Sequence, residues 1–248
     1  MDGSAVKSLE RAIRILECFR DGQHALSARE VADALKLPSS STFVLLRSLV
    51  QIGYLHVDPT TREYFPTLLV TELGSWIPTT AYGLHQPHVL IEEIRDATGE
   101  TATLSVQNDL AMQILDSAVG TQMIVLNVRA GDKLPLFTSN IGHVALSQRT
   151  DGDIAKLVAR ADNLAGSRGK LDQVSLMQEV GKIRQVGYGV GYDSVIEGLG
   201  AIAWPIETPQ PASILVVALA GPTPRIRATE VSSIKKVRAI LKKHKMTT

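Results

Sequence analysis

The alternation of apolar and polar positions between residues 27 and 49 predicts two short helices. Ser27 and Glu30 have the Ser-x-x-Glu spacing of a capping box, which marks the start of a helix. Pro38 suits the first turn of the second helix, where its missing N–H costs nothing. The positions expected to face a core are Val31, Ala34 and Leu35 in the first helix and Thr42, Leu45, Leu46 and Leu49 in the second.

A hairpin is expected to follow the two helices. Gly53 ends the second helix, residues 54–57 and 63–65 have the composition of strands, and residues 58–62 form a turn between them. Two helices joined by a tight turn and followed by a hairpin make a winged helix-turn-helix. We expect this domain to cover residues 1–66.

The outward face of the second helix has a composition that suits a DNA groove. A solvated helix face is normally charged, whereas this one carries hydroxyls, one arginine and two apolar side chains. The alternative, a small α+β core without a nucleic-acid role, leaves this face unexplained. The residues expected to contact double-stranded operator DNA are Ser39, Ser40, Ser41, Phe43, Val44 and Arg47 from the helix and Arg62 from the hairpin turn.

A helical linker is predicted over residues 67–84. Residues 68–77 have helical spacing and are unusually apolar, and Pro78 is expected to stop that helix. An apolar helix between two domains must bury its face, and a partner subunit is the simplest place for it. The linker helix is therefore expected to be a dimer contact, with packing against its own domain as the alternative.

The second domain is expected over residues 85–248, beginning at His85. Strands and helices interleave without a regular βα rhythm, which predicts an α/β domain around a mostly antiparallel sheet and makes the whole chain α+β. The expected helices are residues 89–94, 151–161, 171–186 and 224–245, and the expected strands are residues 101–106, 112–118, 123–128, 199–206 and 213–220.

Composition restricts the class of protein. A chain of 248 residues has room for a small domain and a medium one, and its net charge of +1 neither favours nor excludes nucleic acid. The single cysteine, Cys18, excludes an internal disulfide framework and fits a reducing compartment. The sequence shows no apolar signal region and no run of membrane-spanning length, so we expect a cytoplasmic protein without membrane contact.

Basic residues gather near the C-terminus. Between Arg225 and Lys245 there are eight basic residues and one acid, Glu230. We interpret them as the solvated face of a terminal helix, with a second nucleic-acid contact as the alternative.

The motifs of enzymes and metal sites are incomplete. Residues 187–192 resemble a glycine-rich nucleotide loop, but the position of the third glycine in the Gly-x-Gly-x-x-Gly motif is Tyr192. Residues 166–170 lack the upstream glycine of a P-loop. Only His85 and His88 share a helix face, and no third metal ligand lies nearby. We therefore expect no catalytic residue, no metal and no cofactor.

The chain resembles the IclR family of bacterial transcription regulators over nearly its whole length. Residues 8–16, 26–32, 37–41, 49–54 and 58–59 resemble the DNA-binding half of the family, and residues 97–101, 134–136, 187–188, 197–198 and 220–222 resemble its effector-binding half. The resemblance implies a homodimer or a dimer of dimers, a helical linker and a GAF-like C-terminal domain that binds a small metabolite. Control of a catabolic operon, as repressor or activator, is the expected role.

Two sets of positions depart from the family pattern. Ser39, Phe43 and Val44 stand where many members carry basic residues, so Arg47 and Arg62 must supply more of the contact with phosphate. In the effector half, alanines replace a cysteine and two serines, and a Gly-His pair replaces a Gly-Lys pair. The effector-contacting residues that the resemblance implies are Leu134, Asn140, Ile141, Gly142, His143, Tyr192, Ala201, Ala218 and Ala220.

The alanines bear on the choice of effector. Losing two hydroxyls disfavours a small carboxylate, because a buried charge without partners is costly, and favours an aromatic or extended acyl compound. The alternatives are that the pocket binds nothing and that His143 is an ordinary surface residue.

Two functions therefore compete. The first is a sequence-specific DNA-binding regulator whose operator affinity is modulated by a small organic effector. The second is a metabolite sensor that acts through protein contacts, since the apolar pair Phe43 and Val44 also suits a protein interface. A steep loss of DNA binding with rising salt distinguishes the first from the second.

Overall fold

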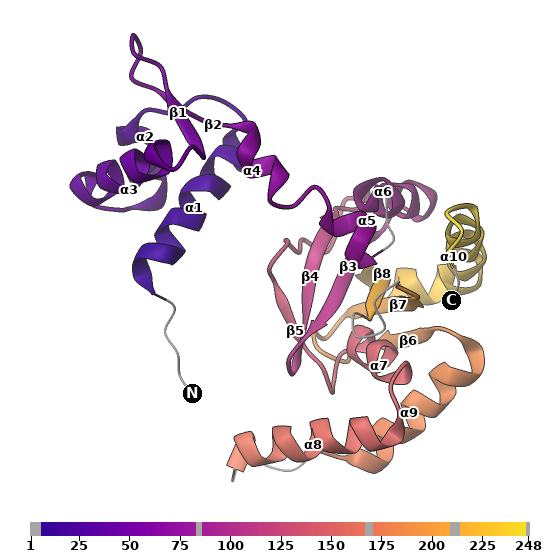
Figure 1. Ribbon diagram of the computed structural model, residues 1–248. Helices are drawn as coiled ribbons and strands as arrows, with labels where there is room; N and C mark the ends of the chain where they lie inside the picture. Colours follow the sequence, from indigo (N-terminus) through magenta and orange to yellow (C-terminus); the bar gives the residue numbers. More distant parts are fainter. Residues whose placement is uncertain (1–5, 83–85, 167–170, 209–213, 247–248) are drawn as a thin grey trace. The chain divides into compact units, whose positions relative to one another are not determined.

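The computed structural model describes residues 6–82, 86–166, 171–208 and 214–246. The chain divides into two compact units, Met1–Ile77 and Pro78–Thr248 (Figure 1). The start expected for the second domain, His85, lies outside the described residues, as does Leu84 at the end of the expected linker.

The first unit is a winged helix-turn-helix, as predicted. Ser27 accepts a hydrogen bond from the Glu30 amide, and the Glu30 carboxylate accepts one from the Ser27 amide at 2.7 Å, which completes the capping box. The two strands pair antiparallel and close a small core centred on Ile15, Phe19 and Leu46. The elements are α1 Lys7–Gly22, α2 Ala28–Leu35, α3 Ser39–Gln51, β1 Leu55–Val57, β2 Tyr64–Pro66 and α4 Leu68–Glu72.

One buried position of α2 was predicted wrongly. Ala34 is exposed, whereas Ala32 is buried beside Val31. The apolar stripe follows Ala28, Val31, Ala32 and Leu35, which is the i, i+3, i+4, i+7 pattern of one helix face, and Ala34 falls outside it.

Residues 68–77 do not form one continuous helix. Helix α4 ends at Glu72, residues 73–76 form a turn, and α5 begins at Ile77 and continues to Tyr82. Pro78 therefore lies in the first turn of a helix and does not stop one. A proline is tolerated there because the first turn needs no N–H from it.

The second unit is built around a six-stranded antiparallel sheet with the strand order β5-β4-β3-β8-β7-β6. The antiparallel pairing confirms the predicted architecture. Its elements are α6 Pro87–Thr98, β3 Thr101–Asn108, β4 Ala111–Ala118, β5 Lys133–Pro135, α7 Asn140–Ser147, α8 Asp151–Ala165, α9 Gln173–Val186, β6 Gly189–Tyr192, β7 Leu199–Ile206, β8 Leu215–Pro222 and α10 Thr223–Lys243.

Helices cover both faces of this sheet (Figure 1). On β7, Ile202 and Trp204 face α6 and α10, whereas Ala203 faces α7. On β8, Val217 belongs to the first of these cores and Ala218 to the second. This period-2 alternation separates two cores, and the α7 side carries most of the residues that the family resemblance associates with an effector.

The strand expected at residues 123–128 is absent. Its carbonyl groups bond to side chains: Thr101 donates to the Leu126 oxygen at 2.6 Å, and Arg225 donates to the Ile124 oxygen at 2.9 Å. The third strand of this half of the sheet is β5, further along the chain. Ser213, the expected start of the last strand, lies outside the described residues, and β8 begins at Leu215.

Candidate DNA-binding surface and candidate effector site

Helix α3 divides into a buried and an exposed face. Thr42, Leu46 and Leu49 are buried in the core of the first unit. Phe43 and Val44 are 47% and 61% exposed, although both are large apolar residues. The outward orientation predicted for this face is confirmed, and it presents apolar surface to any partner.

Three arginines surround a hollow beside α3. The hollow has a volume of about 1010 Å³, and none of the described residues that line it is acidic. The Arg47 guanidinium carbon lies 5.9 Å from the centroid of the Phe43 ring, within the range of a cation–π contact. We call this the cationic hollow, and its described lining consists of Ser27, Ala28, Arg29, Phe43, Arg47, Val50, Gln51, Val57, Arg62 and Tyr64.

Arg29 was not among the predicted contacts. It lies in the first turn of α2, two residues after the N-cap Ser27, and its nearest carboxylate is Asp33 at 3.8 Å. Both side chains are largely exposed, so this ion pair is weak and leaves the guanidinium free to bind an anion. Its position on a supporting helix gave no sequence signal of its place in the hollow.

The N-terminus of α3 is open to an anion. Pro38 is the N-cap and provides no side-chain cap, and no acidic residue lies in the first turn. The exposed Ser39 and Ser40 and the half-buried Ser41 begin the helix, so their N–H groups have no intrahelical acceptor. Free N–H groups and the positive end of the helix dipole favour a phosphate at this place.

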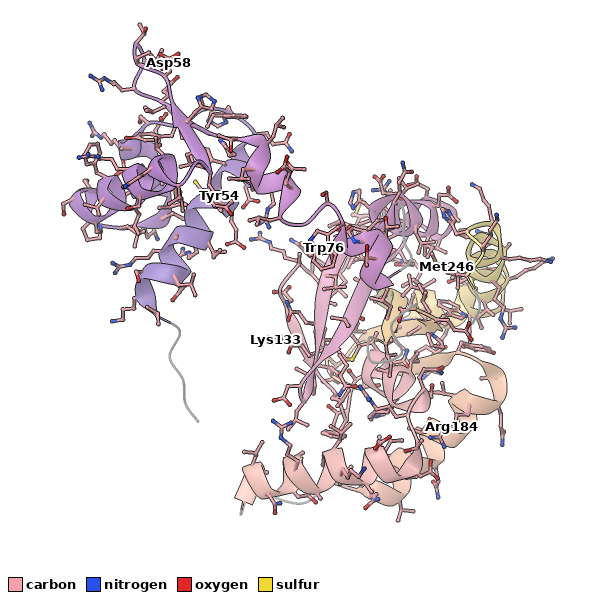
Figure 2. All side chains as sticks on the ribbon, viewed as in Figure 1. Tyr54, Asp58, Trp76, Lys133, Arg184 and Met246 are labelled. Atoms are coloured by element: carbon pink, nitrogen blue, oxygen red, sulfur yellow. The ribbon has the colours of Figure 1, made fainter. Side chains whose placement is uncertain are left out.

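Arg62 is carried at the end of the wing. Asp58 accepts hydrogen bonds from the Thr61 and Thr60 amides at 2.9 and 2.7 Å, and these bonds lower the pKa of its carboxyl group. Figure 2 shows Asp58 at the tip of the hairpin. Arg62 has a left-handed backbone with a φ of 64°, and it closes this turn.

In the second unit, α7 packs closely on the sheet. Ile141 and Ala218 are buried in the core between them, and Leu134 packs against the same core. A Cβ at Gly142 would collide with the Leu136 backbone, so only glycine fits there. Ala201 pairs with Ala220 across β7 and β8, on the face of the sheet that α7 covers.

Asn140 anchors α7 to two strands. Its side-chain nitrogen donates to the carbonyl oxygens of Gly189 and Ala201, each at 3.1 Å. A Cβ at Gly189 would lie 2.6 Å from Asn140 Oδ1, and a Cβ at Gly191 would lie 2.8 Å from Asn140 Cβ. The two glycines therefore allow α7 to lie against β6.

Two adjoining compartments of about 380 and 320 Å³ lie between α7, α9 and β6. We call them together the α7–α9 trough; His143, Glu179 and Ser194 line both compartments. Of the predicted effector residues, Asn140, His143 and Tyr192 line the first compartment. The described lining of neither compartment includes the other predicted residues, which are Leu134, Ile141, Gly142, Ala201, Ala218 and Ala220.

The hydroxyl of Tyr192 is directed to α10. It donates a short hydrogen bond to Glu230, and the guanidinium carbon of Arg227 lies 3.8 Å from the ring centroid. Burial, followed by the bond to Glu230, raises the pKa of Tyr192 to about 12. Tyr192 thus offers the trough its ring and no free hydroxyl, because its polar atom is already bonded.

Glu179 and Lys182 are further trough residues that sequence analysis did not single out. They lie at i and i+3 on α9, and their side chains pair at 2.6 Å. Such a pair is the ordinary signature of a solvated helix face, so its spacing alone gave no reason to place it in a site.

Within the ranges described, no group of three or more His, Cys, Asp and Glu side chains could hold a metal ion. The same ranges contain no helix that is both long and apolar enough to cross a membrane.

Comparison with known proteins covers both units. Residues 8–59 match the family model of the IclR helix-turn-helix domain, and residues 84–244 match that of the bacterial transcriptional regulator IclR C-terminal domain. The acetate operon repressor of Salmonella typhimurium is 26% identical over 251 residues, covering 92% of this chain and 86% of that protein. The Pca regulon regulatory protein of Pseudomonas putida is 25% identical over 209 residues, covering 83% and 70%.

Solved structures show the same fold. The crystal structure of Thermotoga maritima IclR aligns with a TM-score of 0.64 at 20% identity, covering 96% of this chain and 98% of that one. The matches to both halves are in the order that the two units have along the sequence. The chain therefore belongs to the IclR family of bacterial transcriptional regulators, with an N-terminal helix-turn-helix domain that binds DNA.

Proposed function

We propose that this chain binds a roughly palindromic operator as a homodimer or a dimer of dimers, and that a small organic effector changes its affinity for that operator. The cationic hollow carries the proposal, because Arg29, Arg47 and Arg62 converge on it and its described lining holds no acid. A basic hollow beside an exposed helix suits the phosphates and groove of a duplex. In a bacterium such a protein acts in the cytoplasm, where the chromosome lies.

The functional division that we propose places the DNA-binding domain in residues 1–66, the linker in residues 67–84 and the effector-binding domain in residues 85–248. Two relatives are named for the acetate operon and the Pca regulon. Both names support control of an operon or regulon, and the first supports repression; the form of regulation that we propose for this chain is repression of a catabolic operon.

Exposed apolar side chains in the first unit support the dimer. Leu68 and Leu73 are 81% and 57% exposed, and Trp76 is 56% exposed, in and after the short helix α4. A partner subunit would remove this surface from water, and each dimer would then present two copies of α3 to two half-sites. Replacing both Leu69 and Leu73 with aspartate should therefore give a monomer in light scattering.

The effector that we propose is an aromatic or extended acyl compound bound in the α7–α9 trough. Phe137 and Leu176 offer apolar surface in one compartment, and the trough is large enough for a ligand of this size. On the sheet, methyl groups at Ala218 and Ala220 offer no hydrogen bond to a small acid. Both alanines lie outside the described lining of the trough, so serine at both positions should shift the preference toward pyruvate only if the effector also reaches the sheet.

A salt titration tests DNA binding directly. The operator is first selected from a library of randomised duplexes, and its dissociation constant is then measured from low to physiological salt. Release of counterions should make the logarithm of the affinity fall linearly with the logarithm of the salt concentration. A protein that selects no sequence and shows no such dependence would instead support a sensor that acts through protein contacts.

A further inference from the structure

The first compartment of the α7–α9 trough offers two fixed hydrogen-bond acceptors. The Asn140 amide nitrogen donates to two carbonyl groups, which can only accept, so the amide orientation is set. Its Oδ1 atom accepts no hydrogen bond from any of the described residues, although Asn140 is only 8% exposed. This oxygen has a lone pair available to a ligand that donates.

His143 provides the second acceptor by the same reasoning. One ring nitrogen, Nε2, lies 2.8 Å from the Phe137 carbonyl oxygen. Because a carbonyl only accepts, Nε2 must carry a proton, and in the neutral ring Nδ1 is then an acceptor. The backbone carbonyl thus selects the tautomer, and the selected tautomer again requires a ligand that donates.

The charged residues that line the trough also favour a ligand that donates hydrogen bonds over an anion. Its described lining contains two carboxylates, Glu179 and Asp172, and one ammonium, Lys182. Lys182 is paired with Glu179 at 2.6 Å, so its charge is already matched. Hydrogen bonds from the Ser175 hydroxyl and amide lower the pKa of Asp172, which keeps that carboxyl group ionised near neutral pH.

The second compartment is mainly apolar. Phe137, Leu171 and Leu176 contribute to its lining, and its volume of about 320 Å³ accommodates a ring or a short acyl chain. A ligand that spans both compartments would place an apolar body here and a polar group near Asn140 and His143.

We propose that the ligand of this trough is a neutral or cationic hydrogen-bond donor, a hydroxylated or amino compound with an apolar body, and that it is not a carboxylate. This inference rests on the proposed function, since it names the chemistry of the effector. A carboxylate placed in the first compartment would face lone pairs on Asn140 and His143 and the charge of Glu179. It would lose its hydration without gaining donors in return.

Three compounds that share a phenyl ring and a two-carbon side chain test the proposal: 2-phenylethanol, phenethylamine and phenylacetate. Each is titrated into the full chain by calorimetry, with thermal stability as a second readout. The alcohol and the amine should bind, and phenylacetate should bind at least about fivefold more weakly than either, which is the scale of one partly exposed charge interaction. Tighter binding of phenylacetate than of the other two would overturn the proposal.

Two reciprocal variants locate the binding site. Both side chains are partly exposed, so neither substitution threatens the fold. Glu179→Gln removes a carboxylate and frees Lys182, and it should weaken phenethylamine, strengthen phenylacetate and leave the alcohol nearly unchanged. Lys182→Gln should do the opposite. Glu207→Gln, outside the trough lining, serves as the matched control and should change none of the three affinities.

The outcomes separate this inference from the proposed function. If the chain binds its selected duplex but binds none of the three compounds, the inference that the trough binds hydrogen-bond donors is wrong. In a second outcome, the amine and the alcohol bind, their affinities change in the two variants as predicted, and neither compound changes the affinity for DNA. This outcome would support the ligand chemistry and contradict the proposed regulation.

Discussion

The cationic hollow and the α7–α9 trough are opposite in polarity. The cationic hollow of the first unit has three arginines and no acid among its described lining residues, with Phe43 exposed beside them. The α7–α9 trough of the second unit has two carboxylates and one ammonium in its described lining. A polyanion fits the first and is repelled by the second. Charge and the balance of donors and acceptors therefore distinguish the two sites from each other.

The two sites also differ in how their groups are held. Arg47 and Arg62 form no ion pair with any carboxylate of the described residues, so they can exchange water and counterions for phosphate. In the trough, packing and backbone hydrogen bonds fix Asn140 and His143 before any ligand arrives. Cations that have no carboxylate partner suit a long, uniformly charged partner, whereas fixed acceptors suit a small molecule of defined geometry.

The largest effect should come from a buried ion pair that belongs to the second unit alone. Glu100 is 2% exposed and receives two hydrogen bonds from the Arg225 guanidinium. Glu100→Gln leaves the arginine without its charge partner and should lower the free energy of unfolding of that unit by about 3 kcal/mol. Urea denaturation followed by tryptophan fluorescence in a Trp76→Phe background, where Trp204 is the remaining tryptophan, would measure this loss.

Lys156→Gln is a suitable control, because its ion pair with Asp153 is largely exposed. The control should change stability by less than about 1 kcal/mol. Equal stabilities for Glu100→Gln and the wild type would show that the pair is not important for the fold. If Glu100→Gln also weakens DNA binding, the stability of the second unit affects the function of the first, and the two units are not independent.

A smaller effect is expected from the arginine of α3. If Arg47 contacts guanine in the major groove, Arg47→Ala should weaken binding to the selected duplex by about 1–3 kcal/mol and relax one base position. Arg20→Ala is the matched control, since Arg20 lies on α1 and pairs with Asp21 at 2.9 Å. Fluorescence anisotropy measures both. An unchanged base preference in Arg47→Ala would remove Arg47 from the recognition of bases.

The smallest predicted effect concerns a methyl group. The exposed apolar pair on α3 suits the 5-methyl group of thymine, which is the main apolar feature of the major groove. Replacing one contacted thymine by uracil should cost about 0.8 kcal/mol, or about fourfold in affinity. The penalty should shrink in Val44→Ala and persist in the control Arg20→Ala. If no thymine in the selected duplex shows it, the apolar pair has another partner.

Local pattern was sufficient to predict the first unit. The cap at Ser27 and the apolar stripe of α3 are properties of residues a few positions apart, so periodicity exposes them. Within residues 1–66 the error was Ala34, where the buried alanine lies two positions earlier on the same short helix. Beyond them, the one helix expected over residues 68–77 was wrong, because α4 ends at Glu72. The exposed face of α3 could be predicted from the buried positions, because it consists of the residues on the opposite side of the helix.

The trough could not be predicted in this way. Helix α7 is buried at nearly every position, so it shows no polar face and no helical period. Strand β6 contains two glycines, and its sequence resembles a loop. The bond from Asn140 to Ala201 joins residues that are 61 positions apart, and it exists only because α7, β6 and β7 pack together. The family resemblance named Asn140 and His143, whereas only the folded structure determines which of their side-chain atoms stay free to accept a hydrogen bond.

The turn at the tip of the wing contains backbone strain at Arg62. Arg62 holds a left-handed backbone that glycine adopts freely and that other residues adopt with strain. A glycine at this position would relax the turn and would also remove the only cation that the hairpin places in the cationic hollow among its described lining residues. If Arg62 contacts the operator as proposed, selection for thermal stability and selection for operator affinity oppose each other at this residue. We would then expect variants selected for heat resistance to lose DNA affinity first through a substitution at this residue.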